Sequence, residues 1–183
     1  MIRSNSLRAT GLAVALLLSG AVYAAAMSKA DYNAARAKAE STYKSEIDGC
    51  KSLSGNAKDI CKVEAKGRLN VAKAEAEHGY SGKPADMQKH GKAKAEAAYN
   101  VERERCDDLK GNEKDVCIKT AKATRTKATA NLQLNKEVAS ARTDAADAKR
   151  DADYKVAAEK CDALSGDAKT ACVNTAKAKF GKS

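Results

Sequence analysis

Apolar residues follow two different patterns along the chain. One is a short, uninterrupted apolar run at residues 11–22. Beyond residue 26, only 17 Leu, Ile, Val and Phe residues are spread over 157 positions, between long stretches of Ala, Lys, Glu and Arg. These abundant residues are good helix formers, and the pairs Glu40/Lys44 and Glu64/Arg68 place an acid one helical turn before a base. The second pattern therefore predicts helices with little apolar surface to bury.

The first 26 residues are typical of a secretory signal peptide. Arg3 and Arg8 precede the apolar run, and small residues follow it. Cleavage after Ala24 or after Ala26 would satisfy the preference for small residues at such sites. The alternative is an uncleaved anchor, because the uncharged stretch is near the minimum length for crossing a bilayer. No later apolar run exists, so the sequence predicts a periplasmic protein with no membrane span after cleavage.

Three copies of one repeating unit follow the signal segment. Their Tyr, Leu, Gly, Lys and Cys residues align with steps of 56 and then 55 positions. The centre of each copy begins C-x2-L-x-G-[ND], and a second Cys lies 11 positions after the first. Gly suits the left-handed end of one helix, and Asn or Asp suits the start of the next. Each copy is therefore predicted to be a helix, a tight turn and a second helix.

The cysteine spacing supports this chain reversal. On one straight helix, 11 positions span ~16 Å, whereas the Cα atoms of a disulfide lie within ~7 Å of each other. A reversal at the central Gly brings the two cysteines face to face. An even number of Cys in an exported chain favours disulfides. The predicted pairs are Cys50–Cys61, Cys106–Cys117 and Cys161–Cys172.

The units are joined in two different ways. Two Gly and the only Pro of the chain interrupt the helical pattern between the first two units, whereas no Gly or Pro occurs between Gly111 and Gly166. A helix could therefore run over residues 113–164, roughly 75 Å. We predict an all-α protein of three disulfide-stapled helical hairpins, elongated or in a thin antiparallel bundle. Its expected parts are a signal peptide (1–26), hairpin repeat 1 (27–78), a linker (79–85), hairpin repeat 2 (86–140) and hairpin repeat 3 (141–183).

Composition limits the classes of function. Too few apolar residues are present to build a deep, dry pocket, so we expect no enzyme, no catalytic residue and no cofactor. His78 and His90 flank the Pro-containing linker and are predicted to be solvated loop or helix-start residues. Structural zinc sites usually use Cys pairs two to four residues apart, and no such pair exists here. No metal site is predicted, although two thiolates across a hairpin would suit Cu(I) if the cysteines were reduced.

The net charge of +10 adds one candidate binding surface. Residues 116–136 contain no acid, and Lys119, Lys122 and Arg125 follow each other at helical spacing with Lys127 close by. Such a basic stripe could bind a polyanion, for example nucleic acid or an anionic glycolipid. The alternative is a solvated face of a charged helix.

The repeated C-x2-L-x-G-[ND] unit in an exported, Ala/Lys-rich chain resembles a group of betaproteobacterial proteins. These proteins are commonly labelled cell envelope biogenesis protein TolA or TolA-like, and the resemblance covers essentially the whole chain after residue 26. A looser similarity is to the PsiF repeat, which has an L-x-G-[ND] turn between two Cys. The resemblance implies a role in the cell envelope and no catalytic residue.

These observations together lead to one expected function and two alternatives. We expect a non-enzymatic periplasmic structural or adaptor protein of the cell envelope. The first alternative is a polyanion-binding protein, and the second is thiol-based metal binding by reduced cysteines. The partner, an envelope protein or a polyanion, and the oligomeric state are not defined by the sequence.

Overall fold

The computed structural model describes residues 27–182, which are α-helical throughout apart from the turns. The predicted all-α fold is therefore confirmed. The signal peptide predicted at residues 1–26 lies outside the described residues. The helices in chain order are α1 (Lys29–Cys50), α2 (Gly55–Ser81), α3 (Pro84–Arg105), the short 3-10 turn η1 (Cys106–Asp108), α4 (Gly111–Cys161) and α5 (Gly166–Phe180).

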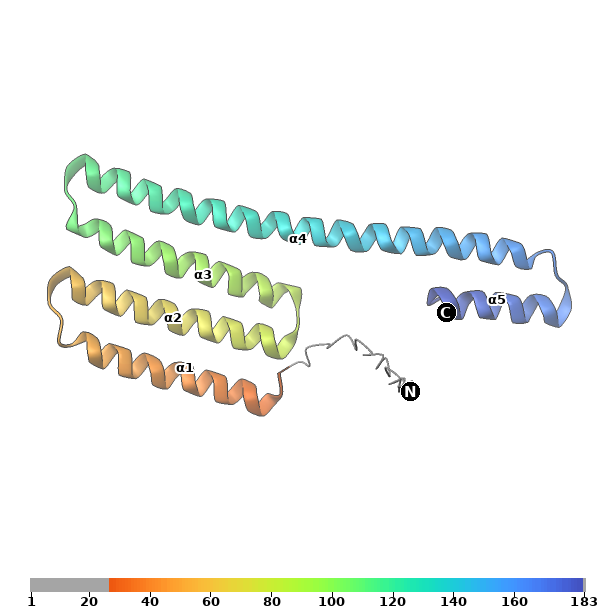
Figure 1. Ribbon diagram of the computed structural model, residues 1–183, viewed down its shortest axis with the longest axis horizontal. Helices are drawn as coiled ribbons and strands as arrows, with labels where there is room; N and C mark the ends of the chain where they lie inside the picture. Colours follow the sequence, from red (N-terminus) through yellow and green to blue (C-terminus); the bar gives the residue numbers. More distant parts are fainter. Residues whose placement is uncertain (1–26, 183) are drawn as a thin grey trace, which may run out of the picture.

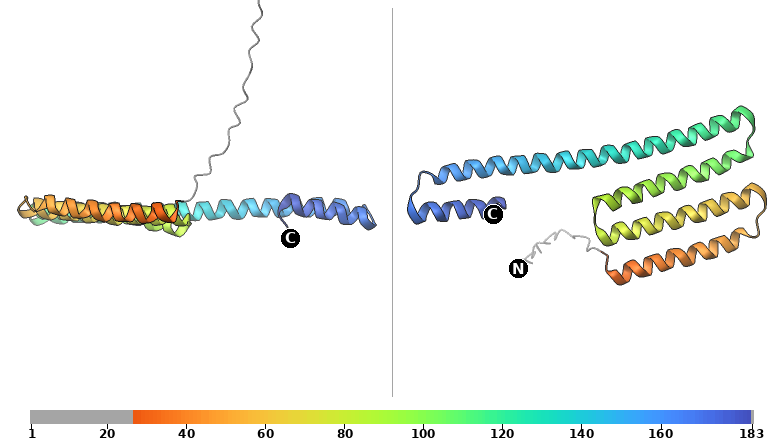
Figure 2. Two further views of the ribbon diagram at one scale, coloured as in Figure 1. Left: turned by 90° about the horizontal axis from the view of Figure 1, so that it is seen from below. Right: turned by 180° about the vertical axis from the view of Figure 1, so that it is seen from behind.

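The first four helices lie side by side and antiparallel in a single layer (Figure 1). Each helix packs mainly against the next one in sequence, from α1 on α2 to α4 on α5. Seen edge-on, the molecule is about one helix thick (Figure 2). The predicted thin, antiparallel arrangement of stapled hairpins is confirmed, and the layer leaves both of its broad faces exposed.

Helix α4 extends well beyond this layer. It runs for 51 residues without a break, since its sequence contains no helix-breaking residue between the two hairpin turns. Its first part packs on α3, and its last part packs on α5. Both neighbours lie on the same side of α4, so its other side forms one long outer edge of the molecule (Figure 1).

Glycines allow each change of direction. Gly55, Gly111 and Gly166 have φ between 54° and 56° at the hairpin turns, in the left-handed region that favours Gly. Between α2 and α3, Gly82 is left-handed at φ 62° and Pro84 occupies the first turn of α3.

The start of α2 differs from the prediction. Asn56 does not cap this helix, and its side-chain amide instead donates to the Glu104 carbonyl oxygen at 3.0 Å.

Small side chains make up most of the core. Within residues 27–182, the buried apolar residues besides Tyr32 and Leu69 are six alanines and one cysteine of each disulfide. Small residues let the helices approach closely, and a Cβ placed on Gly67 of α2 would lie 2.9 Å from the Ala97 Cβ of α3. The exception is the open end of the first hairpin. There the rings of Tyr32 and Tyr80 stack with their centroids 4.9 Å apart, and the Tyr32 hydroxyl donates to Glu77 at 2.7 Å.

Candidate interaction surface

The three disulfides close three of the four helix-to-helix turns of the described residues, and the turn between α2 and α3 has none. The pairs Cys50–Cys61, Cys106–Cys117 and Cys161–Cys172 are as predicted, and the Cα atoms of each pair are 5.7 Å apart. The first cysteine of every pair is at most 1% exposed. All six cysteines are paired, so the reduced thiols that metal binding would require are not present in this structure. Disulfides persist in oxidising compartments, which indicates an extracytoplasmic location.

The first two hairpin turns lie next to each other at one end of the layer, and the third lies at the far end of the molecule (Figure 1). The amide of Asn56 and an ion pair between Arg105 and Glu64, 3.1 Å, join the two neighbouring turns. The leucine of the repeat motif is exposed in each turn: Leu53, Leu109 and Leu164. The ends of the molecule therefore present similar stapled turns, two together and one alone.

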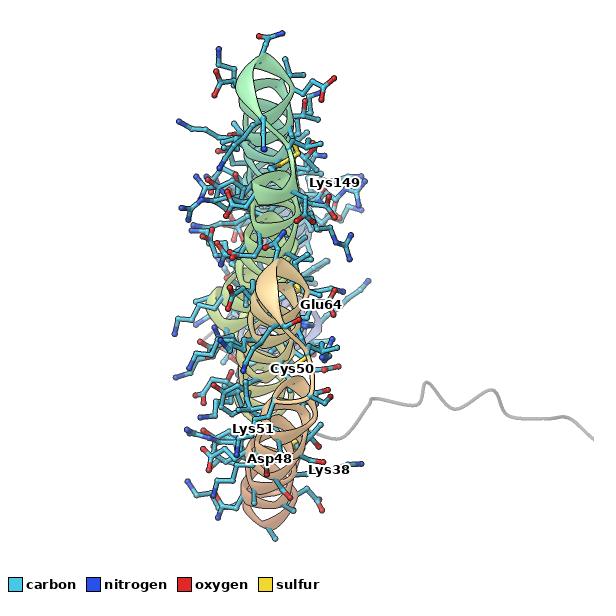
Figure 3. The ribbon with its side chains drawn as sticks, turned by 90° about the vertical axis from the view of Figure 1, so that its left-hand side faces the viewer. Lys38, Asp48, Cys50, Lys51, Glu64 and Lys149 are labelled. Carbon is cyan, nitrogen blue, oxygen red and sulfur yellow. A yellow bond between two sulfur atoms is a disulfide. The ribbon has the colours of Figure 1, made fainter. Side chains whose placement is uncertain are left out.

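Charged side chains cover the broad faces of the layer. In the end-on view of Figure 3 they project to both sides of the stacked helices. Many pair along a single helix, as Asp48 and Lys51 do at 2.6 Å near Cys50. Others join neighbouring helices, such as Lys73 with Glu40 at 2.8 Å, a contact that lowers the pKa of the Glu40 carboxyl. These exposed pairs each contribute little to stability but keep both faces polar.

The structure does not place the four predicted polyanion-binding residues on one face. Arg125 points toward α3, where its guanidinium lies 3.1 Å from Glu96 and 4.3 Å from the ring centroid of Tyr99. Lys119, Lys122 and Lys127 are exposed. Lys127 follows Lys122 by five residues, which is about 140° around a helix, so these two lysines point in different directions.

A different basic cluster lies in the shallow groove between α3 and α4, with a volume of about 560 Å³. Three cations line this groove together with two threonines and one acid: Lys89, Lys92, Arg125, Thr126, Thr129 and Glu96. The sequence analysis missed Lys89 and Lys92, because only the alignment of α3 along α4 brings them beside Arg125. In the sequence, the one indication of this cluster is that Lys89, Lys92 and Glu96 are three and four residues apart, which places them on one side of a helix.

Lys89 also takes part in a hydrogen-bond network around the buried Asp86, at the turn between α2 and α3. The Asp86 side chain is buried, and it accepts hydrogen bonds of 2.7 Å from both Lys89 and Ser81. The Ser81 hydroxyl accepts a further bond of 3.1 Å from the backbone N–H of Lys83. The hydrogen bonds from Lys89 and Ser81 lower the pKa of the Asp86 carboxyl, and Asp86 in turn raises the pKa of Lys89. This network fixes the turn that folds the second hairpin against the first.

The histidines differ from their prediction as solvated loop or helix-start residues. His78 lies in the last turn of α2 and His90 lies within α3, and both are half-buried. Within residues 27–182, no group of three or more His, Cys, Asp and Glu side chains is placed to hold a metal ion. In the same region, none of the helices is long and apolar enough to span a membrane.

Comparison with known proteins adds no relative. No family model matches the chain. No curated protein matches it, and no solved structure matches it either. The fold defines an all-α protein with three disulfides that each join adjacent helix ends.

Proposed function

We propose that the protein is a non-enzymatic structural or adaptor protein of the bacterial cell envelope and that it works in the periplasm. The proposal rests mainly on the single layer formed by α1–α4, which exposes two broad faces while disulfides fix the helix ends (Figure 2). A layer of this kind presents surface to partners along its whole length.

The proposed compartment is supported by two independent features. The disulfides fit an oxidising compartment, and the N-terminal sequence is typical of a cleaved export signal. The resemblance of the repeated Cys unit to TolA-like envelope proteins agrees with both features.

The faces of the layer offer grooves for a partner helix or an extended segment. The groove between α2 and α3 has a volume of about 600 Å³, and Val71, Ala98 and Val101 line it. Glu64, Arg68, Lys94 and Arg105 surround these apolar residues. Ala98 also lines the groove on the other side of α3, which has a volume of about 520 Å³. An apolar floor with a charged rim is the usual site for an amphipathic helix.

A deletion strain tests this proposal. We expect loss of the gene to weaken the envelope barrier, measured as entry of a dye that intact cells exclude, and we expect the wild-type gene to restore it. The variant Ala98→Glu should fail to restore the barrier, whereas the control Ala34→Glu, at another exposed alanine of a helix, should succeed. An unchanged barrier in the deletion strain, or full rescue by Ala98→Glu, would contradict the proposal.

The groove containing Lys89, Lys92 and Arg125 supports polyanion binding as a second candidate function. Filter binding to heparin and to duplex DNA at rising salt tests it, because phosphate contacts weaken steeply with salt. Lys92→Gln should reduce both the affinity and its salt dependence, whereas Lys38→Gln on α1 should change neither. If binding does not depend on salt, this candidate is excluded.

A further inference from the structure

Within residues 27–182, no other helix packs against the middle of α4. Every residue from 133 to 153 is exposed, and at the end of this stretch Asp151 forms an ion pair with Lys182, which follows α5. A run of this length in an ordinary packed helix would have a buried side. The outer edge of α4 is also clear of all other helices, since α1, α2, α3 and α5 lie on its opposite side (Figure 1).

An apolar seam follows this outer edge. Its positions alternate three and four residues apart: Asn131, Leu134, Val138, Ala141, Ala145, Ala148 and Ala152. The side chains of Leu134 and Val138 are 56% and 40% exposed, although apolar side chains at this spacing usually pack against another helix. The seam points away from α3. Leu132 packs against Gly91 of α3, and Leu134 follows Leu132 by two residues, about 200° around the helix.

Charges of opposite sign border the seam on its two sides. Glu137 and Asp144 directly precede the seam residues Val138 and Ala145, and Arg142 and Lys149 directly follow Ala141 and Ala148. In the seven-residue notation of coiled coils, the acids occupy g positions and the bases occupy e positions. Among the ion pairs of the described residues, none involves Glu137, Arg142, Asp144 or Lys149.

We propose that a second copy of this chain packs along the seam, parallel and in register, as a two-stranded coiled coil over residues 131–152. In that arrangement a g residue faces the e residue five positions later on the other helix. Glu137 of one copy then lies opposite Arg142 of the other, and Asp144 lies opposite Lys149. An antiparallel pair would instead place acids opposite acids and bases opposite bases.

The residues of the seam agree with this partner. Val at an a position and Leu at a d position suit two strands, and a single Asn at an a position, here Asn131, sets the register. Because four of the seven seam residues are alanine and bury little apolar area, we expect a weak dimer. This inference rests on the edge of α4 alone and does not depend on the proposed envelope function.

Sedimentation equilibrium of the protein purified after export, from micromolar to millimolar concentrations, tests the proposal. The wild type should dimerise. The double variant Glu137→Lys/Asp144→Lys should weaken the dimer at least about tenfold, since four attractive pairs become repulsive. Adding Arg142→Glu and Lys149→Glu to it should restore the affinity. Ser140→Asp, on the same exposed segment but off the seam, is the matched control.

Each outcome of this series decides the question. All of these side chains are exposed, and an unchanged circular dichroism spectrum will show that the variants fold. Loss of affinity in the double variant and recovery in the fourfold variant support the parallel seam. A wild type that stays monomeric at millimolar concentration, or a dimer that the double variant leaves unchanged, would overturn it.

Discussion

The two halves of the molecule use the same stapled turn in different surroundings. In the four-helix layer, formed by α1, α2, α3 and the first half of α4, each inner helix has two neighbours. In the arm, residues 139–180, α5 packs only on α4. The difference comes from the segments that join the hairpins. Gly82, Lys83 and Pro84 fold the second hairpin back on the first, whereas an unbroken α4 carries the third hairpin away from the layer.

The largest predicted effect comes from introducing the Gly-Lys-Pro sequence of the α2–α3 turn into α4. The variant Asn135→Gly/Glu137→Pro converts Asn135-Lys136-Glu137 into the same Gly-Lys-Pro sequence that separates α2 from α3. Proline inside a helix costs about 3 kcal/mol, so α4 should end there and the arm should change direction. Small-angle scattering should then report a shorter maximum dimension, whereas Ala139→Gly alone should leave it unchanged. A profile identical to that of the wild type would show that the break does not control the shape.

Removing a disulfide should damage the arm more than the layer. Each staple closes a loop of about 12 residues and contributes about 3 kcal/mol by chain entropy. In Cys161→Ser/Cys172→Ser, α5 keeps the buried Ala176 and the edge-on contact of Tyr154 with Phe180. Its remaining polar contacts are two exposed ion pairs, Lys169 with Asp162 and Lys182 with Asp151. We therefore expect its amide protons to exchange as in an unfolded segment.

The matched variant in the layer is Cys50→Ser/Cys61→Ser. Helix α1 keeps the Tyr32–Glu77 hydrogen bond and its ion pairs with α2, so it should stay protected while the whole protein loses about 3 kcal/mol of stability. Hydrogen exchange resolved by residue distinguishes the two cases. Equal loss of protection in α1 and α5 would mean that neighbours add nothing to the staple.

A smaller contrast concerns two tyrosines. The Tyr32 hydroxyl donates to Glu77 and accepts a hydrogen bond of 2.7 Å from Arg36, so Tyr32→Phe should lower the free energy of unfolding by about 1 kcal/mol. Tyr154 makes an aromatic contact and no hydrogen bond through its hydroxyl within the described residues, and Tyr154→Phe should change stability little. Urea denaturation of both variants measures the difference. A comparable loss in the two would contradict the assignment of these hydrogen bonds.

The smallest expected effect is a loss of stability at acidic pH. Because the pKa of Asp86 is lowered in the folded protein, its carboxylate stabilises the α2–α3 turn above the ordinary Asp pKa of about 4. This contribution is lost as the pH falls through the lowered folded pKa. Between about pH 6 and about pH 3, on either side of the ordinary Asp pKa, the thermal stability of the wild type should therefore fall more than that of Asp86→Asn. An equal loss in both proteins would exclude a role for Asp86 in this range.

Much of the fold was predictable from local sequence signals. Helix-forming composition, a central Gly and Cys residues 11 apart are enough to define three stapled hairpins, because each constraint acts within about 12 residues of chain. The role of Asn56 was not predictable in this way. Its partner, the Glu104 carbonyl, is 48 residues away, and only the packing of the second hairpin on the first brings it within reach.

The candidate surfaces likewise depend partly on local sequence and partly on tertiary packing. The sequence alone determined the helices, the disulfides, the uninterrupted α4 and the seam spacing, since all of these depend on the order of residues along one helix or turn. The tertiary structure decided which sides of the helices remain exposed. It turned Arg125 inward to Glu96 and Tyr99 and grouped Lys89 and Lys92 beside it. It also left the outer edge of α4 without a neighbouring helix among the described residues. The physical reason is that each helix must bury one side against its neighbours, and the direction of that side depends on how distant segments pack.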